Sequence, residues 1–152
     1  MTRRDLSDSD PQIRAARADD VEALAPLVAE LGYPTSGREL SPRVERLIAT
    51  PSSGILLAEA RDKVIGFASF HVVDLIYRPR PQARLTAIAV HPSHRRRGIG
   101  QALVRAVEDA ARDRGCFRIE VTTRRDRPAA HAFYRALGYQ ERPVRFVNAL
   151  DR

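Results

Sequence analysis

One segment, from Ala89 to Leu103, limits what this chain can form more than any other. An apolar strand pattern is followed by a basic turn, two glycines spaced by one residue, and an amphipathic helix pattern. Gly98 and Gly100 permit a tight turn and a close approach of the backbone to a ligand. A helix that begins there directs free N–H groups into the turn, next to the consecutive arginines 95–97. The segment is therefore suited to binding a phosphate group.

Two motifs, in this order, resemble those of a known family. Arg95-x-x-Gly98-x-Gly100 resembles the pyrophosphate-binding signature of the GCN5-related N-acetyltransferase (GNAT) family, whose members bind acetyl-coenzyme A. The later segment 129–139 resembles the A-x-x-F-Y-x-x-x-G-[FY] motif of the same family. Elements that fit the family run from about residue 13 to residue 150, so the resemblance covers nearly the whole chain.

The pattern of apolar residues predicts an α+β fold, because stretches that alternate are interspersed with stretches of helical period. The expected order is β-α-α-β-β-β-α-β-α-β. The elements are expected at residues 12–16, 19–31, 38–49, 54–60, 64–74, 83–90, 98–114, 117–121, 129–137 and 145–150. This order fits the fold that the resemblance implies, the GNAT acyl-CoA N-acyltransferase fold. It has a central mixed, mostly antiparallel sheet flanked by helices.

Length and composition fit one globular domain, since 43% of the 152 residues are hydrophobic. We expect residues 1–10 to be a flexible N-terminus and residues 11–152 to be a single acetyltransferase domain. No apolar run is long enough to span a bilayer, and the N-terminus lacks the apolar stretch of a secretory signal. The single cysteine, Cys116, is expected to be a buried, inert thiol in a reducing compartment. These features predict a cytoplasmic protein that does not act at a membrane.

The net charge of +7, which comes almost entirely from arginine, favours an anionic partner. Nucleic acid and coenzyme A are both anionic. A module that stacks on single strands would interleave aromatic residues with the basic ones, and this chain does not. We therefore expect coenzyme A as the anionic partner and no nucleic acid. For the arginines outside residues 95–97, a role in keeping the surface soluble remains open.

The resemblance implies a binding site for acetyl-CoA, the cosubstrate. In the family, the strand before the glycine-rich turn parts from its neighbour, and its backbone binds the pantetheine arm. Carried over by motif position, these backbone groups belong to Ile88, Ala89 and Val90. The other expected coenzyme A contacts are Arg95, Arg96, Arg97, Gly98, Ile99, Gly100, Gln101 and His131. Whether Arg96 and Arg97 pair with phosphates or face solvent stays open at this point.

By the same resemblance, Tyr134 is the expected catalytic residue. Attack of a neutral amine on a thioester expels a thiolate, which a general acid can protonate. The reference pKa of tyrosine is about 10, so the phenol stays protonated at neutral pH and can act in this way. The alternative is a core aromatic residue. Because Phe133 and Tyr134 are adjacent in a predicted helix, we expect Phe133 in the core and Tyr134 in the cleft.

The motifs do not identify the general base. Many family members carry a carboxylate on the strand before the turn, where this chain has residues 85–88 without one. The candidates are Glu120, which is out of phase with its apolar neighbours, and His71, because histidine is a residue type suited to proton transfer near neutral pH. Water is the third candidate. The histidines lack the spacing of metal ligands, and no metal is expected.

Together these observations predict an N-acetyltransferase that moves an acetyl group from acetyl-CoA to a primary amine of a small molecule or a peptide. The sequence shows no Ser-His-Asp or Cys-His constellation, which supports direct attack in a ternary complex. The alternative is a non-catalytic, regulatory protein that binds acyl-CoA. By the same resemblance, the acceptor site is expected at residues 31–36, 77–82 and 144–147. These segments hold few acids, which favours an acidic or neutral acceptor. Relatives that dimerise imply a homodimer.

Overall fold

The computed structural model describes residues 10–151, so nearly all of the segment 1–10, expected to be flexible, lies outside the described residues. The chain divides into two compact units, residues 1–122 and residues 123–152, and each is described by itself. Within the described residues, the first unit contains a sheet and three α-helices, and the second unit contains one further α-helix.

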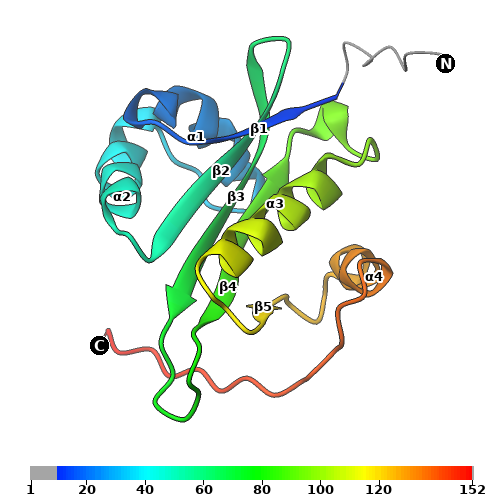
Figure 1. Cartoon of the computed structure of the whole chain (residues 1–152). Coiled ribbons are helices and arrows are strands. Elements are labelled where there is room, and N and C mark those ends of the chain that lie inside the picture. Colours follow the sequence, from blue (N-terminus) through cyan, green and yellow to red (C-terminus); the bar gives the residue numbers. More distant parts are fainter. Residues whose placement is uncertain (1–9, 152) are drawn as a thin grey trace, which may run out of the picture. The chain divides into compact units, whose positions relative to one another are not determined.

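The first unit is built on a five-stranded sheet in the order β1-β2-β3-β4-β5 (Figure 1). The strands are β1 (Gln12–Ala15), β2 (Ser53–Ala60), β3 (Lys63–Val73), β4 (Gln82–Val90) and β5 (Ile119–Val121). Neighbours from β1 to β4 are antiparallel, whereas β5 runs parallel to β4. A parallel neighbour requires a long crossover, and a helix supplies it here. The expected mixed, mostly antiparallel sheet is confirmed.

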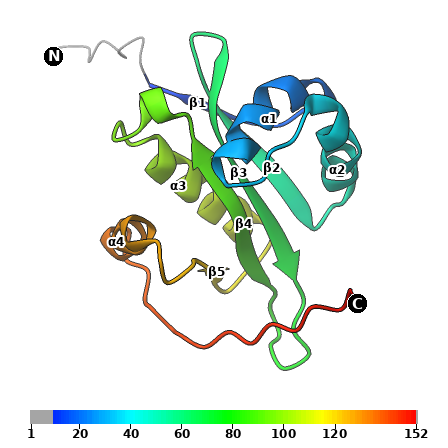
Figure 2. The same ribbon diagram turned by 180° about the vertical axis from the view of Figure 1, so that it is seen from behind.

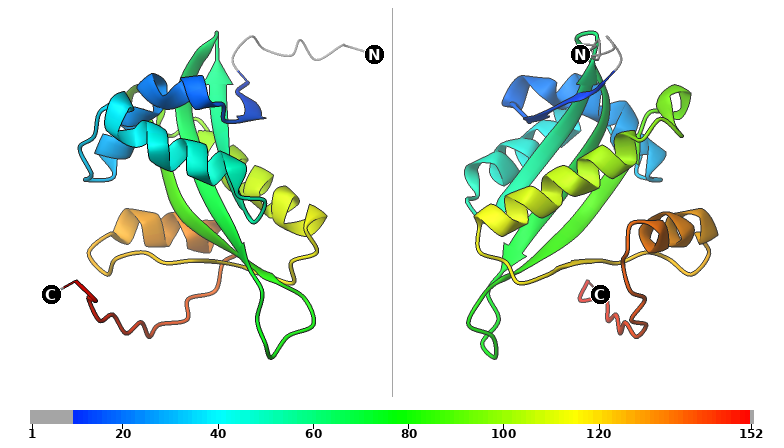
Figure 3. Two further views of the ribbon diagram at one scale, coloured as in Figure 1. Left: turned by 90° about the vertical axis from the view of Figure 1, so that its left-hand side faces the viewer. Right: turned by 45° about the vertical axis from the view of Figure 1, so that its right-hand side comes forward.

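Helices cover both faces of this sheet. The helices α1 (Val21–Glu30) and α2 (Gly37–Ala49) lie on one face and α3 (Ile99–Asp113) lies on the other, as Figures 2 and 3 show. A short 3-10 helix, η1 (Ala18–Asp20), leads into α1. The core under α1 and α2 is formed by Leu24, Leu27, Leu40, Val44, Leu57 and Phe67.

The helix α3 is the amphipathic helix that the sequence predicts after the two glycines. Leu103 and Val104 on its inner side are fully buried. Gly66 of β3 permits this close packing, because a Cβ atom there would lie 3.2 Å from Leu103 Cδ1 and 3.1 Å from the carbonyl oxygen of Ala89. The start of α3 is thereby fixed against β3 and β4.

The strands β4 and β5 pair over three residues only. Residues 83–85 of β4 are opposite residues 119–121, and the described part of the chain gives β4 no further strand on this side. The remainder of β4, residues 86–90, therefore has an open edge where β5 has ended. We call residues 86–90 the fork edge.

A β-bulge in β4 lies where the fork edge begins. Ser69 of β3 is opposite Ala87, but the next residue, Phe70, is opposite Leu85, so Thr86 is an extra residue in β4. A bulge of this kind bends a strand and increases its twist. It also changes which side chains of β4 face each side of the sheet.

The second unit contains α4 (Pro128–Ala136). Pro128 begins the helix, at a position where its missing N–H leaves no hydrogen bond unmade. Gly138, with φ +90°, ends it in the left-handed conformation that glycine favours.

The predicted strand over residues 145–150 is wrong, because residues 140–151 form neither helix nor strand. Alternating apolar residues favour an extended backbone, but a strand also needs a neighbour that pairs its backbone groups. None of the described strands pairs with this segment. Its large apolar side chains are therefore exposed; they are Val144, Phe146, Val147 and Leu150.

The other predicted elements are present, with ends within two residues of the expected ones. Their signals are local, since they come from the period of apolar residues and from Gly, Pro and Ser at the ends. Within residues 10–151, no helix is both long and apolar enough to cross a membrane.

Leu103 tests how α3 packs on the sheet. Leu103→Ala removes a side chain that is 0% exposed, and the cavity left behind should lower the free energy of unfolding by about 3 kcal/mol. Urea denaturation followed by circular dichroism measures it. The control is Gln101→Ala, an exposed position of the same helix, expected within about 0.5 kcal/mol of wild type. Equal small losses in both variants would contradict this packing.

Candidate functional site

The turn between β4 and α3 contains a short helix and two residues with positive φ. The short 3-10 helix η2 (Pro92–His94) begins after His91, whose ring accepts a hydrogen bond from the backbone N–H of Ser93 at 3.2 Å. The chain then passes through Arg96, with φ 63°, and Gly98, with φ 78°. This left-handed region suits glycine and is uncommon for arginine. Gly98 is thus required by the backbone of the turn itself.

The first turn of α3 leaves its N–H groups without a capping side chain. Gly98 is the N-cap residue and cannot accept a hydrogen bond through a side chain, and no acidic residue lies in the first turn. The helix α2 differs, since Ser36 Oγ accepts a hydrogen bond from the N–H of Glu39 at 3.1 Å. The N–H groups of residues 99–101 therefore combine with the positive end of the helix dipole. Such an arrangement binds anions.

The three arginines of the turn differ in their contacts. Arg95 Nε donates to the carbonyl oxygen of Val90 at 3.3 Å, and its Nη2 lies 3.1 Å from Glu30 Oε2 at the end of α1. Arg95 thereby connects the turn to β4 and α1. Arg96 and Arg97 are exposed and have no ion-pair partner among residues 10–151. Their guanidinium groups are free to meet an anion.

Backbone groups of the fork edge point alternately toward β3 and toward the open side. The N–H of His91 donates to the carbonyl oxygen of Ile65 in β3 at 2.7 Å. In an antiparallel ladder, residues bonded to that neighbour alternate with residues whose groups point away from it. Ala89 therefore turns its backbone toward β3, whereas Ile88 and Val90 direct theirs to the open side.

A row of polar side chains crosses the sheet just beyond the fork edge. Ser53 of β2 is opposite His71 of β3, His71 is opposite Arg84 of β4, and Arg84 is opposite Glu120 of β5. Ser53 Oγ is 3.0 Å from His71 Nδ1, and Arg84 Nη2 is 3.3 Å from Glu120 Oε1. The side chains of Arg84 and Glu120 are 51% and 39% exposed. We call these four residues the polar row.

The polar row lies on the face that carries α1 and α2. Residues two apart in a strand share a face, so His71 faces the same side as Phe67, which packs under these helices. In β5, Ile119 packs with Ala111 of α3, so Glu120 faces the opposite side. The structure therefore brings both candidate bases, Glu120 and His71, to one face.

The motifs do not identify Arg84, although it lies between the two candidate bases. Its signal in the sequence is a single charged residue within the apolar run of β4. Its partner cannot be read from the sequence, because the pairing of residue 84 with residue 120 is set by the crossover through α3. Only the register brings the two charges together.

Tyr134, in the second unit, is the one residue of α4 that is buried. Its ring centroid lies 5.0 Å from that of Phe133 and 5.6 Å from that of Tyr139. Burial raises the pKa of Tyr134 to about 12. Phe133 is only partly buried, so the expectation that Phe133, rather than Tyr134, fills the core is wrong. The chain turns back after Gly138 and packs Tyr139 against Tyr134, which covers it.

His131, also on α4, is held by its own unit. Its Nε2 atom lies 2.7 Å from the carbonyl oxygen of Arg124, an acceptor that requires the proton on this nitrogen. The other ring nitrogen is left for a further contact. Among the described residues, no group of three His, Cys, Asp or Glu side chains could hold a metal ion.

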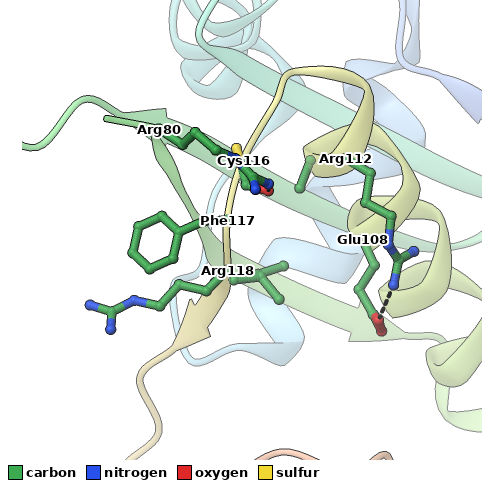
Figure 4. A pocket seen from close by; sticks show the side chains of 8 residues that line it. Arg80, Glu108, Arg112, Cys116, Phe117 and Arg118 are labelled. Carbon is green, nitrogen blue, oxygen red and sulfur yellow. Dashed lines mark hydrogen bonds and ion pairs between the residues drawn. The ribbon is translucent and has the colours of Figure 1, made fainter. Parts of the chain in front are cut away.

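A pocket of about 350 Å³ lies on the side of α3 (Figure 4). It is lined by Arg80, Glu108, Ala111, Arg112, Cys116, Phe117, Arg118 and Ile119. Its arginines bind protein atoms: Arg80 Nη2 donates to the carbonyl oxygen of Cys116 at 2.8 Å, and Arg118 Nε donates to Gln82 at 2.6 Å. Burial raises the pKa of the Cys116 thiol, which is buried as expected. A protonated thiol is a poor nucleophile, which agrees with direct transfer.

Residues 21–139 match the acetyltransferase (GNAT) family. An aminoglycoside N(6')-acetyltransferase type 1 from Stenotrophomonas maltophilia is 30% identical over 136 residues, covering 88% of each chain. An aminoalkylphosphonate N-acetyltransferase from Salmonella typhimurium is 27% identical over 144 residues, covering 91% of each chain. The chain spans only about half the length, 46%, of mammalian N-acetyltransferases that it matches at 30% identity.

The fold is shared with solved structures. The aminoglycoside N-acetyltransferase AAC(6')-Iy, in complex with CoA, has a TM-score of 0.84 at 24% identity, covering 94% of this chain and 97% of that chain. This similarity confirms the expected fold. The family match spans the turn at Gly98 and the segment around Tyr134, the two motifs on which the expected family rested. The chain therefore belongs to the acetyltransferase (GNAT) family.

Proposed function

We propose that this chain transfers an acetyl group from acetyl-CoA to a primary amine of a small molecule or a peptide. The observation that carries the proposal is the first turn of α3, where uncapped N–H groups meet two unpaired arginines at the end of an open strand edge. Family membership supports the reaction, and a structural neighbour was solved in complex with CoA. Relatives named for an aminoglycoside and for an aminoalkylphosphonate leave the acceptor open.

In this proposal the turn holds the diphosphate of coenzyme A. The N–H groups of residues 99–101 donate to it, Gly98 leaves room for it, and Arg96 and Arg97 neutralise its charge. The amide groups of the pantetheine arm bond to the open backbone of Ile88 and to the N–H of Val90. Ala89 and Arg95 then shape the site through their contacts with β3 and α1. His131 remains a proposed contact from the second unit.

Acetyl-CoA supplies the acetyl thioester, and side chains or water accept and donate the protons. An ammonium substrate loses one proton to become the nucleophile and a second as the new N–C bond becomes an amide. Glu120, His71 or water accepts these protons. As the C–S bond breaks, the thiolate takes one proton from Tyr134, which regains it from solvent. One proton is released overall.

The state of Tyr134 favours hydrogen bonding at the sulfur. Its pKa of about 12 keeps the phenol protonated throughout the neutral range. A thiol has a reference pKa of about 8.5, so complete proton transfer from this phenol to a thiolate is uphill. We therefore propose that Tyr134 donates a hydrogen bond while charge develops on sulfur and passes its proton late. The role rests on the family motif and on this protonation state.

Tyr134→Phe tests the enzyme against the alternative of a non-catalytic acyl-CoA binder. We expect kcat to fall about 100-fold, the usual contribution of a general acid, with the Kd for acetyl-CoA unchanged. Thiol release and calorimetry measure the two quantities. Tyr139→Phe removes a hydroxyl from the same aromatic cluster and should keep its activity.

The pH profile of this activity gives a further check. Because the pKa of Tyr134 is raised to about 12, the donor persists as pH rises through the usual range of tyrosine and is lost only near the raised value. A loss of the Tyr134-dependent activity at the ordinary pKa of tyrosine would contradict the assignment. A wild type that binds acetyl-CoA and acetylates no amine would favour the binder.

The turn is tested by removing both of its unpaired arginines. Arg96→Gln/Arg97→Gln should raise the Kd for coenzyme A about tenfold at low salt, and the difference should shrink as salt screens exposed charges. The matched control, Arg112→Gln/Arg114→Gln, removes the same charge about 20 Å away at the other end of α3 and should keep its affinity. An equal loss of coenzyme A affinity in both double variants would mean that the effect comes from net charge alone and not from the turn.

A further inference from the structure

We propose that the polar row binds the acceptor, and that the acceptor is a short zwitterion, a primary amine with a carboxylate or phosphonate group a few bonds away. The inference rests on the proposed function, from which it takes the position of the thioester. It concerns Arg84 and Glu120 above all, with Ser53 and His71 beside them.

The fork edge joins the turn to the polar row. It extends over residues 86–90, about 13 Å of strand, with the basic turn at one end. Arg84 lies two residues beyond the other end, where β4 begins to pair with β5. A ligand anchored in the turn and laid along the fork edge therefore ends beside Arg84 and Glu120. An acceptor must reach the reacting group at this place.

The charges of the polar row match a molecule that carries both signs. Arg84 Nη2 lies 3.3 Å from Glu120 Oε1, so a positive and a negative group stand side by side, both partly exposed. A short zwitterion can place its anion on the guanidinium and its ammonium on the carboxylate. A guanidinium has five N–H donors in a planar fork, and the contact with Glu120 leaves donors for a bidentate bond to an oxyanion.

Further hydrogen-bonding groups surround this pair on the same face. The hydroxyls of Ser69 and Thr86 are 2.7 Å apart. They lie two residues from the polar row along β3 and β4, toward the fork edge. On the other side of Arg84, His71 is hydrogen-bonded to Ser53 at 3.0 Å. An oxyanion with several oxygens would find donors from three strands here. Such a set serves a small polar ligand better than an extended apolar one.

The same charges disfavour a polycation. Glu120 is the one carboxylate of the polar row, and Arg84 already pairs with it. The chain as a whole carries a net charge of +7, which repels a polycation at a distance and attracts an anion. The row therefore selects for an amine that brings its own negative charge.

Binding to the complex with coenzyme A, which has no acetyl group to transfer, tests the inference without turnover. Glycine and aminoethylphosphonate are titrated separately by calorimetry, so that the two arms distinguish a carboxylate from a phosphonate. We expect one or both to saturate the protein, and Arg84→Gln to weaken binding about tenfold or more. Arg84→Lys, which keeps the charge and loses the planar fork, should restore part of the affinity.

The ion pair between Arg112 and Asp109 on α3 provides a matched control. The two are 2.9 Å apart, both side chains are exposed, and α3 lies on the opposite face of the sheet. Arg112→Gln should bind both zwitterions as the wild type does. Thermal unfolding of each variant shows that it is folded.

Glu120→Gln separates recognition from a purely structural ion pair. A structural role predicts that Glu120→Gln and Arg84→Gln behave alike, because either one breaks the pair. Recognition predicts that ethylphosphonate, an anion without an amine, binds to the wild type and to Glu120→Gln but not to Arg84→Gln.

The inference is overturned if neither zwitterion binds, if Arg84→Gln binds them as tightly as the wild type, or if spermidine binds more tightly than both. Failure of the proposed function would look different. In that case acetyl-CoA would not bind, or its acetyl group would reach no amine, while the zwitterion titrations would still report on the polar row.

Discussion

The early end of pairing between β4 and β5 is the constraint on which the rest of the site depends. The ladder stops at Leu85 and Val121, and the extra residue Thr86 bends β4 at that point. Ile88 and Val90 consequently direct backbone groups to a side where no described strand follows. Backbone groups inside a sheet are nearly always paired, so an open edge in this place calls for water or a ligand. The basic turn lies at one end of this edge, and the polar row at the other.

The sequence predicts the turn well because the turn depends on local chemistry. Gly98 adopts a left-handed conformation, and the first turn of α3 lacks a capping side chain. Arg96 and Arg97 lie next to this turn because they directly precede it in the sequence. The same holds for the helices and most strands, whose periods and end residues are local signals. An anion site at the start of α3 is thus predictable from a dozen or so consecutive residues.

The polar row could not be predicted, because it depends on register across four strands. Neither the bulge at Thr86 nor the pairing of Arg84 with Glu120 has a local signal. The failed strand over residues 145–150 has the same cause, since alternation indicates an extended backbone but not a partner. The burial of Tyr134 in place of Phe133 escapes prediction for a related reason. What covers Tyr134 is Tyr139, which reaches it only after the chain turns at Gly138.

Amide hydrogen exchange by NMR, with and without coenzyme A, tests the central claim most directly. The open edge predicts that the amides of Ile88 and Val90, and those of residues 99–101, exchange more slowly once coenzyme A is bound. Ala89 is the internal control, because its backbone already bonds to β3 and its exchange should change little. Saturation with coenzyme A that leaves the exchange of Ile88 and Val90 unchanged would contradict the account, since the ligand would then lie elsewhere.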